Sequence, residues 1–125
     1  MKGTIKAKRE FDAVYEHGRR AHGPHVVLFL LPREKGREIL GDRFVDETRA
    51  GVVASRRVGN AVARNRAKRV LRAALRDVND LLPVSSRVVL VARRSLVRDG
   101  ARSPEMANEL RELFERCDRS EGDSR

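Results

Sequence analysis

The sequence predicts an α/β sandwich, an α+β fold in which helices pack on one mixed central sheet. Apolar runs of strand length stand at residues 25–31, 50–57 and 86–93. Helical patterns or start signals stand at residues 7–17, 60–78 and 103–117. With a short extended piece after the first helix, the order is αβββαβα. This order lacks the regular strand–helix alternation of a doubly wound fold.

The first helix is expected over residues 7–17. Phe11, Val14 and Tyr15 are spaced so that they lie on one side of a helix. Gly18 follows them, and glycine is a common helix stop.

A short extended piece is expected at residues 19–22, before a Gly-Pro turn. Residues 25–31 read HVVLFLL, which is too short and too rich in strand formers for a helix, so we expect a buried strand. Residues 32–49 are expected to be a long polar connection, with at most a marginal turn at residues 38–40.

The third strand is expected at residues 50–57, AGVVASRR, and Asn60 is a suitable N-cap for the helix after it. The helix at residues 60–78 is the best-determined element, and Pro83 is expected to end it. One continuous apolar stripe runs along this helix: Ala63, Ala67, Val70, Leu71, Ala74 and Val78.

The last strand is expected at residues 86–93, SRVVLVAR, and a final helix at residues 103–117. A chain of 125 residues is long enough for one hydrophobic core. We therefore expect a single domain over residues 1–117 and a disordered polar tail over residues 118–125.

Positive charge is concentrated in one part of the chain. The formal net charge is +10, and residues 49–76 contain nine basic and no acidic residues. Those nine are Arg49, Arg56, Arg57, Arg64, Arg66, Lys68, Arg69, Arg72 and Arg76. A basic domain of this size suggests a nucleic acid first, an anionic membrane surface second and an acidic protein third.

The basic face of the helix at residues 60–78 favours a nucleic acid. Lys68, Arg69, Arg72 and Arg76 project away from the apolar stripe together with Asn65, while Arg64 and Arg66 lie at its two borders. A merely solvated face would mix glutamates with these cations, since like charges at i,i+4 cost a few tenths of a kcal/mol. Membrane binding is disfavoured, because the apolar stripe has no Trp or Phe to insert.

Other features of the sequence suggest a cytoplasmic protein. Cys117 is the only cysteine, which fits a reducing compartment. The N-terminus does not resemble a signal peptide, and no apolar run reaches the roughly 20 residues of a membrane span.

Protein catalysis and metal binding are also disfavoured. The three histidines are His17, His22 and His25, and steps of five and three do not place them on one helix face. A carboxylate cluster stands at Asp42, Asp46 and Glu47, in what we expect to be a solvated loop. Ser55 has no candidate base. We expect no catalytic residue and no metal ligand in this chain.

The string from Ala63 to Arg72 contains R-N-R-x-K-R-x-x-R and follows S-R-R-V-G-N-A-V. This resembles the signature of the protein subunit of bacterial ribonuclease P. The segment F-x-x-V-Y-x-x-G that begins at Phe11 is similar to the family's first helix. Val26–Leu31 resembles its apolar strand, and residues 88–94 resemble its strand that ends in a basic pair. The resemblance covers roughly residues 8–115.

The resemblance implies a fold like the second domain of ribosomal protein S5. It also implies a left-handed crossover through the helix at residues 60–78, although such units are right-handed in roughly 98% of cases. In this family an RNA subunit cleaves the phosphodiester bond. The protein helps to bind precursor tRNA and to stabilise the RNA and its Mg²⁺ ions, which the RNA holds for the most part. No organic cofactor, membrane or DNA is expected.

Two sets of candidate site residues result. The RNA-binding set is Arg56, Arg57, Asn60, Arg64, Asn65, Arg66, Lys68, Arg69, Arg72 and Arg76. The resemblance implies that six of these, Arg64, Asn65, Arg66, Lys68, Arg69 and Arg72, belong to the motif that lies against the RNA subunit. The set that matches a cleft for the single-stranded 5′ leader is Phe11, Tyr15, Val27 and Phe29. Aromatic rings can stack on unpaired bases, but spacing alone favours core packing for these four residues. An alternative function is a ribosome-associated or ribosomal RNA-binding assembly protein, which needs no such cleft.

Overall fold

The computed structural model describes residues 3–119, and its side chains as far as Asp118. The strands are β1 Gly3–Thr4, β2 Arg19–His22, β3 Val26–Leu31, β4 Arg49–Val53 and β5 Arg87–Ala92. The α-helices are α1 Lys8–His17, α2 Arg33–Leu40, α3 Ala61–Asp77, α4 Arg94–Arg98 and α5 Ser103–Arg119. Short 3-10 helices lie at η1 Gly41–Arg43, η2 Arg56–Val58 and η3 Asn79–Leu81.

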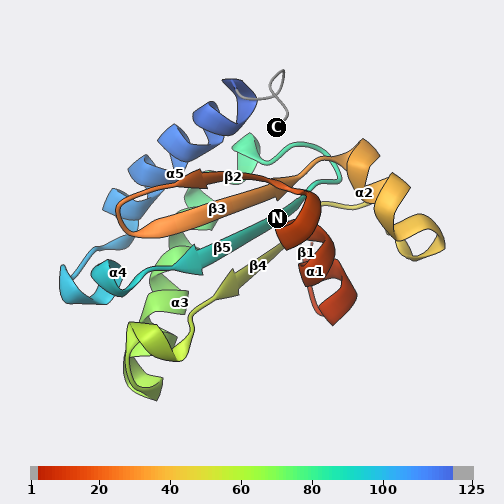
Figure 1. Cartoon of the computed structure of the whole chain (residues 1–125). Coiled ribbons are helices and arrows are strands. Elements are labelled where there is room, and N and C mark those ends of the chain that lie inside the picture. The colour runs from red at the N-terminus through yellow and green to blue at the C-terminus, as the bar shows by residue number, and fades with distance from the viewer. Residues whose placement is uncertain (1–2, 120–125) are drawn as a thin grey trace.

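One mixed sheet carries the fold (Figure 1). Its strand order is β1-β4-β5-β3-β2, in which β1, β4 and β5 are parallel and β3 and β2 are antiparallel to their neighbours. Helices pack on both faces of the sheet, so the predicted α+β class with one mixed sheet is confirmed.

The two faces of the sheet bury two separate apolar clusters. Leu28 and Leu30 of β3 point to the face covered by α3 and α5, where they pack with residues such as Leu71. Leu31 and Val14 belong to the opposite face, which α1 and α2 cover in part. This alternation follows from the two-residue period of a strand. Phe29, Val53 and Val91 on this second face are only half-buried, so part of the face is open to solvent.

The β4–α3–β5 unit is a left-handed crossover, as the family resemblance implied. In Figure 1, β4 and β5 both point down and to the left, β5 lies above β4, and α3 lies behind the sheet.

Several boundaries differ from the sequence-based expectation. Residues 33–40 form α2, where we expected a polar connection with a marginal turn. Strand β4 ends at Val53 rather than at residue 57, because the backbone turns into η2. Helix α3 ends at Asp77, and η3 rather than more α-helix leads to Pro83.

The C-terminal boundary also differs. Helix α5 continues to Arg119, beyond the expected end at residue 117, so the first two residues of the expected tail are helical. The rest of that tail, residues 120–125, lies outside the described residues. Strand β1 and helix α4 were not expected from the sequence.

A buried ion pair fixes α1 to the sheet. The Arg87 side chain is fully buried on β5, and its Nε donates to Glu10 Oε2 of α1 at 2.7 Å. Arg49 of β4 donates to the other Glu10 oxygen at 3.2 Å. The Arg87 guanidinium also donates to the carbonyl oxygens of Val45 and Glu47, each at 2.6 Å. These bonds hold residues 44–48 in place, so the expected solvated loop is in fact anchored.

His25 joins the β2–β3 turn to α5. Its Nδ1 lies 2.8 Å from Glu109 Oε1 and its Nε2 lies 3.1 Å from Asp99 Oδ2. A neutral imidazole can donate only one hydrogen bond, so two carboxylate partners favour the imidazolium form. Burial acts to lower the pKa of His25, but the bonds to Glu109 and Asp99 outweigh it and raise this pKa above 6.5.

The stability of the protein should therefore fall as pH rises through the raised His25 pKa. A group whose pKa is higher in the folded state stabilises fully below its unfolded pKa and loses that contribution above its folded pKa. We expect the free energy of unfolding, measured with urea, to drop as the pH rises from about 6.5, the ordinary histidine pKa, through the raised pKa of His25. His25→Asn should flatten this drop, and His22→Asn, at an exposed histidine, should leave it in place. An unchanged slope in His25→Asn would contradict the assignment.

Candidate nucleic-acid interface

The turn before α3 has a defined local structure. The Ser55 side chain accepts a hydrogen bond from the Arg57 N–H and caps η2. Gly59 follows with φ 147°, a conformation that side chains rarely adopt, and a Cβ there would lie 2.9 Å from that of Ala63. Asn60 then caps α3 by accepting from the Ala63 N–H at 2.9 Å, as predicted. Helix α3 therefore starts at a fixed place beside the end of β4.

The predicted apolar stripe of α3 faces the core, and the basic residues face outward. Ala67, Leu71, Ala74 and Val78 are buried, and Leu75 is buried with them although it was not predicted. The exposed members of the predicted RNA-binding set are Arg56, Arg57, Asn60, Asn65, Arg66, Arg69, Arg72 and Arg76. Arg64 and Lys68 are half-buried, and Arg64 donates to the Gly59 carbonyl oxygen at 3.2 Å. We call these ten residues the α3 surface.

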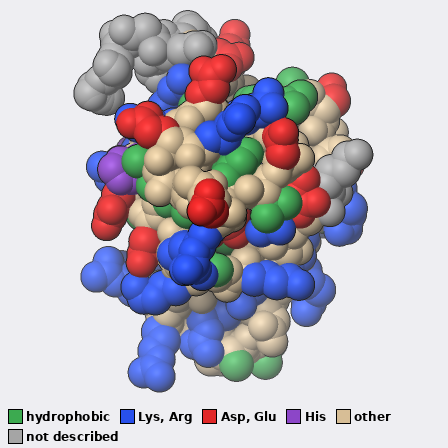
Figure 2. All heavy atoms as spheres, turned by 90° about the vertical axis from the view of Figure 1, so that its right-hand side faces the viewer, with side chains coloured by type: hydrophobic (Ala, Val, Ile, Leu, Met, Phe, Trp, Pro, Cys, Tyr) green, Lys and Arg blue, Asp and Glu red, His purple; other side chains and the backbone are tan. Residues whose placement is uncertain are grey.

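The cations of the α3 surface are not neutralised by ion pairs in the part of the chain that the structure describes. Figure 2 shows Lys and Arg gathered over the lower half of one side of the molecule, while most acidic side chains lie above them. Arg49, which belongs to the same run of basic residues, is bound to Glu10 and Glu47 and is not part of this surface.

The four predicted cleft residues lie together on the other face of the sheet. The ring centroids of Phe11 and Tyr15 are 6.3 Å apart. Those of Tyr15 and Phe29 are 5.0 Å apart, and these two rings meet edge to face. Val27 lies two residues before Phe29 on the same face of β3. Tyr15 is 36% exposed, and the other three residues are half-buried. This partial exposure differs from a wholly buried core cluster. We call these four residues the aromatic cleft, after the cleft that the family resemblance predicts for them.

Two further residues shape the aromatic cleft and were missed from the sequence. Arg20 of β2 pairs with Phe29 across the hairpin, and its guanidinium carbon lies 5.9 Å from the Phe29 ring centroid. Counting outward from the Gly-Pro turn could have placed Arg20 opposite Phe29. Gly51 of β4 lets the Phe11 ring come close, since a Cβ there would lie 2.9 Å from Phe11 Cε1.

Two of the three carboxylates considered for catalysis are engaged in structural contacts. Asp46 accepts from Ser85 and Arg33, whose hydrogen bonds lower the pKa of this carboxyl. Glu47 is paired with Arg49. Among the described residues, no three His, Cys, Asp or Glu side chains are grouped so that they could hold a metal ion. In the same part of the chain, no helix has the length and apolarity needed to cross a bilayer.

Comparisons with known proteins agree with these features. The family model named Ribonuclease P matches residues 2–118. The ribonuclease P protein component of Nitratiruptor sp. is 42% identical over 121 residues, which are 95% of this chain and 97% of that protein. The corresponding protein of Desulfovibrio desulfuricans is 39% identical and covers 92% of this chain and 82% of its own.

Solved structures show the same fold. The RNase P protein from Thermotoga maritima has a TM-score of 0.71 at 22% identity, with 90% of this chain and 96% of that chain covered. The RNase P protein from Staphylococcus aureus has a TM-score of 0.68 at 21% identity, with 90% and 92% covered.

Proposed function

Because this chain belongs to the ribonuclease P protein family, we propose that it assists a catalytic RNA in removing the 5′ leader from precursor tRNA. The observation that carries this proposal is the presence of two different surfaces on one small domain. The α3 surface is cationic and has no acidic partners within the described residues, whereas the aromatic cleft is apolar and half-exposed.

The α3 surface suits folded RNA. Arginine forks bind phosphate oxygens in pairs, and a helix face lined with them can follow a phosphate backbone. Arg64, Asn65, Arg66, Lys68, Arg69 and Arg72 match the motif that lies against the RNA subunit in this family. We assign the α3 surface to the RNA subunit and to the region near the cleavage site.

The aromatic cleft suits an unpaired strand. Bases can stack on Phe11, Tyr15 and Phe29 without a sequence preference. Partial burial and the nearby Asp12 carboxylate raise the pKa of Tyr15, so its phenol stays protonated at neutral pH and can donate a hydrogen bond. A protein that only binds ribosomal RNA has no need for such a cleft, which favours ribonuclease P over the assembly-protein alternative.

In this proposal the RNA subunit performs the cleavage and holds most of the Mg²⁺ ions, and the protein supplies no catalytic residue. Its partners are the ribonuclease P RNA and precursor tRNA, in the cytoplasm. Electrostatic stabilisation of the closely packed phosphates is the contribution that the α3 surface can make to the RNA and its metal ions.

Loss of an aromatic ring from the cleft should weaken binding of precursor tRNA but not of mature tRNA. We expect Tyr15→Ala or Phe29→Ala to cost about 1–3 kcal/mol of precursor binding, the usual contribution of one stacked base. Affinities of the assembled ribonucleoprotein for both tRNAs would measure this. Arg69→Ala is the contrasting variant, since it should weaken assembly with the RNA subunit, or the binding of precursor and mature tRNA together. If the folded Tyr15→Ala and Phe29→Ala variants lost equal affinity for precursor and mature tRNA, the two-surface proposal would be refuted.

A further inference from the structure

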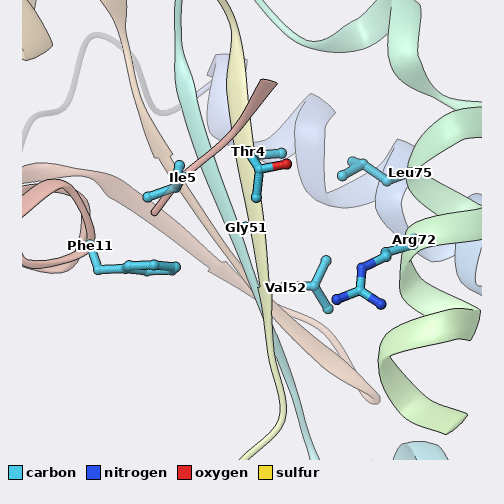
Figure 3. Close-up of a pocket in the computed structure, with 8 residues that line it drawn as sticks. Thr4, Ile5, Phe11, Gly51, Val52, Arg72 and Leu75 are labelled. Carbon is cyan, nitrogen blue, oxygen red and sulfur yellow. The ribbon is translucent and has the colours of Figure 1, made fainter. Parts of the chain in front are cut away.

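A cavity of about 290 Å³ lies at the free edge of the sheet, between the two surfaces described above (Figure 3). It is lined by Thr4, Ile5, Phe11, Ala50, Gly51, Val52, Arg72 and Leu75. It exists because β1 is only two residues long and pairs with Arg49 and Ala50, so that the outer edge of β4 is uncovered beyond that point.

The backbone of Val52 faces this cavity. In β4, the Arg49 N–H bonds to Ser86 on the β5 side, while the Ala50 carbonyl oxygen accepts from the Ile5 N–H on the β1 side. Backbone groups alternate sides along a strand, so the N–H and carbonyl of Val52 point to the open edge, as those of Ala50 do. Within the described residues no hydrogen bond to either group of Val52 is formed from this side. An unpaired edge N–H is a ready donor to an incoming chain.

Side chains from both surfaces meet at this edge. Figure 3 shows the Arg72 guanidinium of α3 directed toward Val52, and the Phe11 ring directed toward Gly51 from the other side of β4. Arg72 is exposed and forms no ion pair within the described residues. Phe11 therefore belongs both to the aromatic cleft and to the wall of the cavity, and Arg72 belongs both to the α3 surface and to that wall.

We propose that the edge of β4 is a phosphate site through which the single-stranded 5′ leader passes between the aromatic cleft and the α3 surface. The Val52 N–H donates to a phosphate oxygen, Arg72 pairs with the same phosphate, and Phe11 contacts the neighbouring base. This inference rests on the proposed function and adds to it a physical link between the two surfaces.

An RNA strand fits this edge better than a peptide strand. A peptide that extends the sheet needs a row of free backbone groups, whereas only three residues of β4, from Gly51 to Val53, lie beyond its pairing with β1. A phosphate needs only one N–H and one guanidinium. The cations of the α3 surface next to the cavity also favour a polyanion.

The test removes the Val52 donor alone. Proline is tolerated on an edge strand where its missing N–H would face outward, so Val52→Pro should fold, which circular dichroism would verify. We expect it to weaken binding of a precursor tRNA with a long leader about tenfold, the effect of one hydrogen bond to a charged group. Binding of mature tRNA should stay at the wild-type level. Val52→Thr, which keeps the N–H, should restore affinity for the precursor.

A second measurement needs no variant. In the wild-type protein, an oligouridine strand should shift the NMR amide signals of Val52 and Thr4 along with those of the aromatic cleft. Shifts at Tyr15 and Arg20 without any at Val52 would overturn the inference while leaving the proposed function intact. A shift of Val52 with an oligoglutamate peptide but not with oligouridine would also overturn it. Failure of the proposed function would show differently, as equal binding of precursor and mature tRNA by wild type and Tyr15→Ala.

Discussion

Replacement of Arg87 by methionine should lower the free energy of unfolding by about 3–5 kcal/mol, the usual cost of leaving one member of a buried ion pair uncompensated. The Arg87 side chain has no exposed surface and that of Glu10 has 5%. Without the guanidinium, Glu10 would keep only Arg49 as a partner. The carbonyl oxygens of Val45 and Glu47 would also lose the bonds from Arg87, although that of Val45 would keep the Glu47 N–H as a donor. Urea denaturation would measure the loss.

A double variant is the matched control for Arg87→Met. In Arg87→Met/Glu10→Gln no buried charge is left without its partner, so the double variant should lose less than the sum of the two single variants. Because the pair fixes α1 to the sheet, Arg87→Met should also loosen the aromatic cleft more than the α3 surface. A loss below about 1 kcal/mol, as for an exposed ion pair, would show that the buried contacts do not determine stability.

Neutralisation of three arginines on α3 should have the largest effect on RNA binding. If five or six side chains of the α3 surface neutralise phosphates, log K should fall against log salt with a slope of about −4 to −5. Arg66→Gln/Arg69→Gln/Arg72→Gln should make this slope shallower by about three. The affinity for the RNA subunit should fall on the order of 100-fold at physiological salt. The triple substitution removes charge from an exposed face and spares the buried stripe.

An equal change of charge elsewhere provides the comparison. Arg37, Arg43 and Arg111 are also exposed but lie on α2, η1 and α5. Their replacement by glutamine changes the net charge equally, so it separates local contacts from the overall field of a +10 protein. The slope should then stay close to that of the wild type. Equal slopes for the two triple variants would mean that the cations of α3 are only solvated.

The main elements could be predicted because their patterns are local. The Ala67–Leu71–Ala74 spacing identifies α3, and the run from Val26 to Leu31 identifies β3. Asn60 was predicted as an N-cap because capping depends on residues only three apart. The handedness of the crossover came from the family resemblance, since the general rule favours the opposite hand.

Elements that depend on tertiary contacts could not be predicted. Helix α2 contains Gly36, a poor helix former, yet a Cβ there would lie 3.1 Å from Phe44 Cε1, so packing selects the glycine. Strand β1 is too short to leave a pattern. The Arg87–Glu10 pair joins residues 77 apart, and the only local sign of it is a charged residue at the start of the apolar run VVLVA.

The candidate site, too, could be predicted where it depends on local patterns and not where it depends on tertiary contacts. The composition of the α3 surface was visible in the sequence, because a helix places residues at known angles. Spacing alone favoured core packing for the four cleft residues, and the 36% exposure of Tyr15 is a result of tertiary packing that spacing does not record. The position of Arg72 beside the Val52 edge depends on the packing of α3 against β4, which no local pattern records.

Reconstitution tests the central claim most directly. The purified protein is added to a bacterial ribonuclease P RNA, and cleavage of precursor tRNA is followed at near-physiological Mg²⁺. We predict that the two together remove the 5′ leader under conditions in which the RNA alone is inefficient, and that the protein alone leaves precursor tRNA intact. Metal-dependent cleavage by the protein free of RNA, or no stimulation of the RNA at all, would contradict the account.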